Sequence, residues 1–100
     1  MIILTTVEFP PQNAKEIGKR FMESASLPDY LTRIGPFVLP LKGEGFQSFT
    51  IYQVDRPTRI AEAFEFVSNE MTKYFDVPGF THNISLCLDA EEALKTVGLG

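Results

Sequence analysis

Several residue types are scarce in this chain of 100 residues, and each scarcity excludes a class of site. Cys87 is the only cysteine, so no intrachain disulfide can form. His82 is the only histidine, and one histidine with one cysteine does not make a tetrahedral metal site. No glycine-rich phosphate loop lies at the first strand–helix junction, EFPPQNA. We therefore predict a protein without a metal ion or cofactor.

Positive charge is also scarce. Nine Lys and Arg residues stand against thirteen Asp and Glu residues, which gives a net charge of −4. The only basic clusters are Lys15, Lys19 and Arg20, and Arg56 with Arg59, and both fall on predicted helices. A phosphate-binding surface needs cations gathered on one face. We therefore expect no nucleic-acid partner.

Long apolar runs are missing as well. The opening MIIL stops after four residues and follows no basic segment, whereas a signal peptide or a membrane-spanning helix needs a much longer stretch. We therefore expect a cytoplasmic protein with no membrane partner. Hydrophobic residues make up 44% of the chain, which is enough for one domain with a single core over residues 1–100.

What is present is an alternation of strand and helix patterns. Runs rich in β-branched and aromatic residues predict strands at 2–8, 30–39, 46–54 and 80–88. Apolar residues at helical spacing predict helices over about 13–25, 55–75 and 89–98. The second helix carries the apolar stripe Ile60, Phe64, Val67 and Met71.

Capping signals support two of these helices. Asn13 is followed three residues later by Glu16, and Asp89 by Glu92, which is the spacing of a capping box. Gly98 is suited to end the last helix.

The resulting order, β-α-β-β-α-β, predicts a ferredoxin-like α+β fold. We expect a four-stranded antiparallel sheet with the spatial order 4-1-3-2, two long helices on one face and a short C-terminal helix. Pro36 and Pro40 place the second strand at an edge, because proline cannot donate to a central ladder.

Two helices cover only one face of such a sheet, so strand alternation must assign residues to the open face. On the first strand we expect Ile2 and Leu4 to face the helices, and on the third Phe49 and Ile51. On the fourth strand the apolar set is Ile84, Leu86 and Leu88, with His82 on the same side. The residues then expected on the open face, and proposed as ligand-binding, are Thr5, Phe46, Ser48, Thr50, Tyr52, Asn83 and Ser85.

These uncharged, partly apolar residues suit a pocket with a few hydroxyl groups, or a face covered by a partner. We therefore predict a small-molecule-binding or regulatory protein with a partly apolar cavity on the open face, assembled as a homodimer through that face. Whether the face forms a pocket or only a subunit interface stays open.

Catalytic groups are few. His82 and Tyr52 are the candidates for acid–base chemistry, and they define the alternative of a cofactor-independent enzyme. Arg33 is a candidate for binding a carboxylate, and Cys87 reads as a buried, unreactive thiol.

The stretch 42-KGEGFQSF-49 raises a third alternative, an RNA-recognition motif, whose third strand carries a similar pattern. Glu44 occupies a position where that motif has a base-stacking aromatic residue, and the first strand has no aromatic within IILTTV. Stacking contributes about 1–3 kcal/mol per base, so this reading ranks last. The glycines are better explained as turn residues with positive φ.

Four segments together resemble the dimeric α+β barrel superfamily: MIILTTVEF, GPFVLP, FQSFTIYQVD and FTHNISLCLDAEEALKTVG. The resemblance covers nearly the whole chain as pattern and topology. The members of this superfamily are small ferredoxin-like bacterial proteins whose open sheet faces pack together in pairs. The resemblance implies the same fold and the same pairing for this chain. The superfamily includes cofactor-independent monooxygenases, lactone isomerases, haem-degrading enzymes and stress-responsive barrels. The haem-degrading branch uses an Asn-Trp-His constellation, and this chain has no tryptophan.

Overall fold

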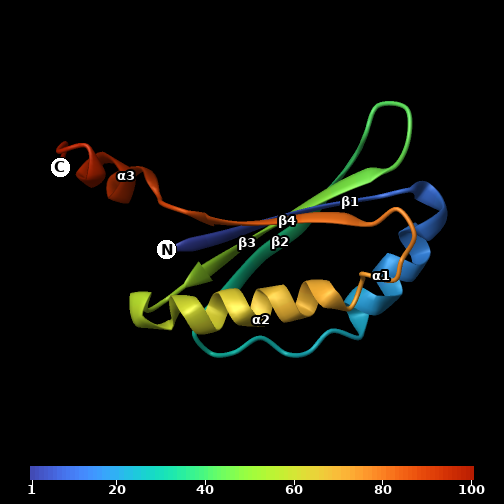
Figure 1. Ribbon diagram of the computed structural model, residues 1–100, viewed down its shortest axis with the longest axis horizontal. Helices are drawn as coiled ribbons and strands as arrows, with labels where there is room; N and C mark the ends of the chain where they lie inside the picture. Colours follow the sequence, from blue (N-terminus) through green and yellow to red (C-terminus); the bar gives the residue numbers. More distant parts are fainter.

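The computed structural model describes residues 1–100 and has the predicted element order β-α-β-β-α-β followed by a third helix (Figure 1). The elements are β1 Ile2–Phe9, α1 Ala14–Met22, β2 Leu31–Pro40, β3 Phe46–Val54, α2 Ile60–Thr72, β4 Thr81–Cys87 and α3 Ala90–Thr96. A short 3-10 turn precedes each of the first two helices, at Pro11–Asn13 and Pro57–Arg59. The two long helices end about three residues earlier than their apolar patterns predict.

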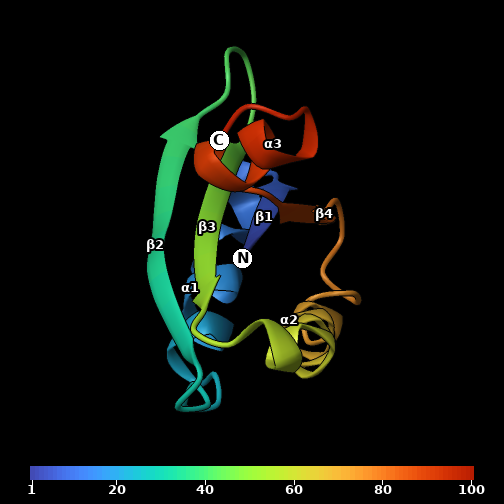
Figure 2. The same cartoon turned by 90° about the vertical axis from the view of Figure 1, so that its left-hand side faces the viewer.

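The four strands form one antiparallel sheet with the order β2-β3-β1-β4, which is 4-1-3-2 when read from the β4 edge. Figure 2 shows β2 at one side of the sheet and β4 at the other. The proline-containing β2 lies at an edge, as expected, and its pairing with β3 is irregular between Ile34 and Phe37. This α+β architecture is compatible with a ferredoxin-like fold.

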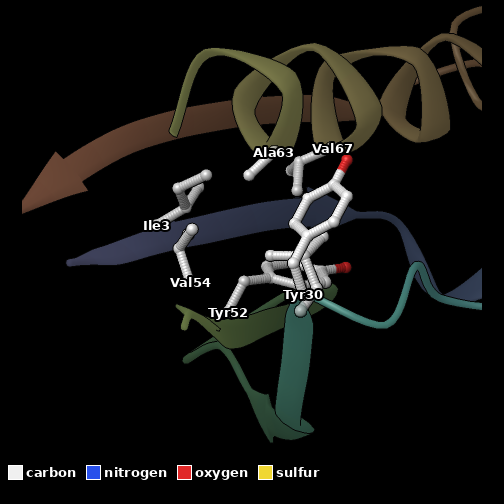
Figure 3. Packing of buried hydrophobic residues seen from close by; sticks show 7 residues of the cluster. Ile3, Tyr30, Tyr52, Val54, Ala63 and Val67 are labelled. Carbon is white, nitrogen blue, oxygen red and sulfur yellow. The ribbon is translucent and has the colours of Figure 1, made fainter. Parts of the chain in front are cut away.

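Helices α1 and α2 lie on the same side of the sheet (Figure 1). From α2, Ala63 and Val67 pack against Ile3, Tyr52 and Val54 of the central strands, and Figure 3 shows these side chains together. A second cluster joins Phe9 of β1, Ile17 of α1, and Tyr74 and Val77 after α2. The two clusters fix both helices to the face of the sheet that carries Ile3, Val7 and Phe9 of β1.

The apolar stripe of α2 differs from the prediction by one position. Phe64 is 37% exposed, whereas its neighbour Ala63 is fully buried and packs on the sheet. The close approach of the helix to β1 explains the choice, because a small side chain fits where a phenyl ring does not.

The capping predictions had different outcomes. The capping box at α3 is confirmed: the Asp89 side chain accepts from the Glu92 amide, and the Glu92 side chain accepts from the Asp89 amide. The predicted Asn13 cap is wrong, because the Asn13 amide group donates to the Pro78 carbonyl oxygen instead. This contact joins the start of α1 to the turn before β4.

Helix α3 extends beyond the end of the sheet, on the side where β4 ends (Figure 1). None of its residues is buried. None of the three helices has the length and apolar character needed to cross a bilayer.

The predicted face assignment is wrong on β1 and β3. Ile3 and Thr5 point toward the helices and are 0% and 2% exposed, whereas Ile2 and Leu4 lie on the opposite face. On β3 the helix-facing residues are Ser48, Thr50, Tyr52 and Val54, so Phe49 and Ile51 lie on the open face. On β4 the assignment is confirmed: Ile84 and Leu86 pair with Thr5 and Ile3 and share their face.

Candidate functional site

A cavity of about 320 Å³ lies between the sheet and the two long helices. This volume is at the lower end of the range of small-molecule sites, roughly 300–1,000 Å³. Fourteen of its 22 lining residues are hydrophobic. The apolar wall includes Val7, Phe9, Ile17, Phe21, Leu27, Phe46, Phe66, Met71 and Phe80.

The sheet contributes three small hydroxyl groups to the cavity floor, those of Thr5, Ser48 and Thr50. Thr5 lies directly opposite Thr50 in the β1–β3 ladder, and Ser48 is two residues before Thr50 on the same face. None of the side-chain hydrogen bonds of the molecule uses these hydroxyls. No fully shielded side-chain oxygen or nitrogen lacks a partner, so these hydroxyls are open to the cavity.

Tyr52 continues the same face of β3 and is 6% exposed. Burial raises the pKa of its phenol above the usual value, and the neighbouring Arg33 guanidinium opposes that shift in part. The phenol is therefore protonated at neutral pH, and its O–H is a hydrogen-bond donor.

Two charged side chains line the cavity, and they differ in how they are compensated. Arg33 of β2 lies opposite Tyr52 in the ladder, and its guanidinium stacks 4.9 Å from the centre of the Phe21 ring. None of the six ion pairs involves Arg33. Glu70 of α2, in contrast, is held by Lys73 with an N–O distance of 2.9 Å.

Five of the seven residues predicted to bind a ligand therefore line one cavity, although it lies on the helix side of the sheet. They are Thr5, Phe46, Ser48, Thr50 and Tyr52. The other two, Asn83 and Ser85, lie on the open face as predicted, where the Asn83 amide donates to the Ser85 hydroxyl at 3.1 Å.

The catalytic candidate His82 is exposed and is not part of the cavity wall. Its ring lies 5.1 Å from that of Phe75 and 6.0 Å from that of Phe80. Cys87 is half-buried on the open face, two residues beyond Ser85.

Sequence reasoning missed several wall residues, chiefly Phe21, Leu27, Phe66 and Glu70. Glu70 had a detectable signal: it follows Ala63 by seven residues and precedes Met71, so it lies on the inward stripe of α2. A carboxylate at such a position is unusual enough to mark a polar site.

The open face of the sheet is apolar over part of β1, β2 and β3, whereas Gln47 and Gln53 of β3 and Asn83 and Ser85 of β4 make the rest of it polar. Its residues on β1, β2 and β3 include Ile2, Leu4, Ile34, Phe37, Leu39, Phe49 and Ile51. The Phe37 and Phe49 rings pack 5.3 Å apart, and Phe37 is 47% exposed. No helix of the chain covers this face.

Comparison of the chain with protein-family models, curated proteins and solved structures gave no match.

Proposed function

We propose that this protein binds a small, partly apolar molecule in the cavity between the sheet and helices α1 and α2. The observation that carries the proposal is the set of buried hydroxyls open to this space, Thr5, Ser48 and Thr50. These hydroxyls reach the cavity and take part in no side-chain hydrogen bond of the chain, so they are available to a molecule bound there. A ligand with hydrogen-bonding groups satisfies them and orients itself by doing so.

Binding fits the wall chemistry better than proton abstraction. Of the two acid–base candidates, only Tyr52 reaches the cavity, and its raised pKa favours the neutral donor over the phenolate base. The enzyme alternative therefore retains Tyr52 as a hydrogen-bond donor that polarises a substrate carbonyl, and it loses His82 as a partner.

We further propose that two copies pair through the open sheet faces, as in the dimeric α+β barrels. The support is the apolar surface formed by β1, β2 and β3, with Phe49 and Ile51 of the middle strand β3 between the other two strands. Contiguous exposed apolar surface of this kind is rare on monomers and marks an interface. A second copy of the chain can cover this face, because a two-fold axis brings the same apolar surface of both copies together. The apolar part of the face also carries few charges that pairing would have to desolvate.

Binding of the dye 8-anilinonaphthalene-1-sulfonate tests the cavity. Ser48→Leu places added carbon atoms inside the cavity, and we expect it to weaken dye binding about tenfold, the effect of roughly 1.4 kcal/mol. Gln47→Leu is the matched control, because Gln47 is the preceding residue of β3 and points to the open face.

Circular dichroism of both variants verifies that the fold is kept. Equal dye affinity in wild-type protein and a folded Ser48→Leu variant would contradict the proposal. Tighter dye binding by Gln47→Leu, with no effect of Ser48→Leu, would place the dye on the open face instead.

A further inference from the structure

Arg33 is the one charged group of the cavity wall without an opposite charge. It lies on β2 next to Tyr52, and no carboxylate of the chain is within ion-pair distance of it. The carboxylate that shares the cavity, Glu70, is bound to Lys73. A half-buried cation without a partner is costly, and an anion within the same cavity removes that cost.

We infer that the cavity selects ligands with a carboxylate group, which Arg33 and Tyr52 bind at one end while the apolar wall holds the rest of the molecule. This inference rests on the proposed function and names the ligand class for the same site. The sequence predicted Arg33 as a candidate for carboxylate binding. The structure places Arg33 in the cavity wall, opposite Tyr52 and without an ion-pair partner.

The geometry of Arg33 suits a planar anion. Its Cζ atom lies over the Phe21 ring, 4.9 Å from the ring centre, and this cation–π contact holds the guanidinium in place without using its N–H donors. A guanidinium edge presents two parallel N–H donors that match the two oxygens of a carboxylate. Tyr52, directly opposite Arg33 in the ladder, adds a phenol donor.

The wall also defines the rest of the ligand. Only one uncompensated cation is present, so a single negative charge is matched and a phosphate dianion is not. Phe21, Leu27 and Phe66 line the cavity with Arg33, which favours an aromatic or branched aliphatic body. A small aromatic carboxylic acid therefore fits the site.

Calorimetric titration with 3-phenylpropionate and its neutral analogue 3-phenylpropanamide tests the inference. We expect wild-type protein to bind the acid at least about tenfold more tightly than the amide, since the carboxylate forms an ion pair with the guanidinium through both oxygens, whereas the amide accepts through one neutral oxygen. Arg33→Met keeps an unbranched apolar side chain over Phe21 and should abolish this preference, because the acid loses more affinity than the amide when the guanidinium is removed.

Two further variants keep the test decisive. Arg33→Lys retains the charge without the paired donors and should keep only part of the preference. Arg56→Met removes an exposed arginine outside the cavity and should leave both affinities unchanged.

The outcomes separate the inference from the proposed function. Equal affinity of wild-type protein for acid and amide overturns the carboxylate preference and leaves the cavity proposal intact. Failure of both probes, while dye binding still depends on Ser48, also overturns the carboxylate inference. Failure of both probes together with dye binding that ignores Ser48 overturns the proposed function itself.

Discussion

Arg20 joins the two helical segments of the chain through one guanidinium group. Its Nε donates to Glu16 within α1 at 2.9 Å, and its Nη1 donates to the Lys73 carbonyl at 2.8 Å. The same group binds both carboxylate oxygens of Asp76, at 2.5 and 3.2 Å. The end of α2 is thereby held against α1, and the helix positions on the cavity depend in part on this contact.

The Arg20–Asp76 pair predicts a pH dependence of stability. The hydrogen bond from Arg20 holds the pKa of Asp76 below its usual value. A carboxylate with a depressed folded-state pKa stabilises the fold above its unfolded pKa, about 3.9, and this contribution is lost as pH falls through the folded-state value. Asp76→Asn should therefore lower the urea midpoint near pH 7, and the difference from wild type should vanish in acid.

Urea unfolding of wild-type protein and Asp76→Asn at several pH values measures this effect. Asp29→Asn, which removes an exposed carboxylate that forms no ion pair, is the control. A difference between wild type and Asp76→Asn that does not shrink as the pH falls below the unfolded pKa, about 3.9, would show that the charge of Asp76 does not stabilise the fold.

Single residues also show how far sequence reasoning reached the site. Alternation correctly grouped Thr5 with Tyr52, Thr50 and Ser48, which do share a face. It placed that face on the wrong side, because the apolar residues Phe49 and Ile51 were expected under the helices. The helix-facing side holds a cavity, so Ser48 and Thr50 lie there, and Phe49 and Ile51 lie on the open side. Alternation alone reports which residues share a face and not what covers it.

At the scale of elements, the β2–β3 hairpin depends on its glycines. Gly43 and Gly45 have φ values of +99° and +87°, as the KGEG turn predicted. A Cβ at Gly45 would lie 2.7 Å from the Phe9 carbonyl oxygen, whereas a Cβ at Gly43 would have no neighbour within 4 Å. A substitution at Gly43 therefore tests backbone strain alone, whereas a substitution at Gly45 tests backbone strain together with a steric conflict.

Alanine substitution at these positions tests this difference. Gly43→Ala should lower the free energy of unfolding by about 1–2 kcal/mol, the cost of a left-handed conformation for a residue with a Cβ. Gly45→Ala should lower it further, by about 2–4 kcal/mol in total, because the Phe9 backbone must also shift. Chemical denaturation of both variants gives the comparison. Equal losses would show that the close approach to Phe9 relaxes without cost.

Element types were predictable, and the exceptions involve distant partners. The strand 46–54 and the capping box of α3 depend on neighbouring residues, so local patterns were sufficient to find them. The Asn13 cap failed because its side chain bonds to Pro78, which is 65 residues away in the chain. Ala63 displaced Phe64 from the core for a similar reason, since the spacing between helix and sheet is set by tertiary packing.

At the scale of the whole molecule, the single chain has a thin core. Only 15 of its 100 residues are buried, and its radius of gyration is 15.1 Å, compared with about 13 Å for a compact domain of this length. The extents of 47 × 30 × 18 Å describe a flat molecule with one face covered by helices. A layer that covers the open face would give Ile51 and Phe49 the burial that the chain alone does not provide.

The proposed dimer makes Ile51 the most informative position. Ile51 pairs with Leu4 on one side and Ile34 on the other, which places it inside the apolar face. Ile51→Lys would bring a charge into the interface, and its two-fold copy would add a like charge. We expect the dimer dissociation constant to rise about a hundredfold, the effect of roughly 3 kcal/mol.

Analytical ultracentrifugation gives the mass of each species, and circular dichroism verifies the fold of the variants. Gln12→Lys is the control, because Gln12 is exposed in the 3-10 turn before α1 and is not part of the sheet. Wild type and Gln12→Lys should sediment as two chains, and Ile51→Lys as one. A wild-type monomer at micromolar concentration would contradict the pairing. A dimer of unchanged affinity in Ile51→Lys would show that two copies associate through another surface, which would leave the apolar face open.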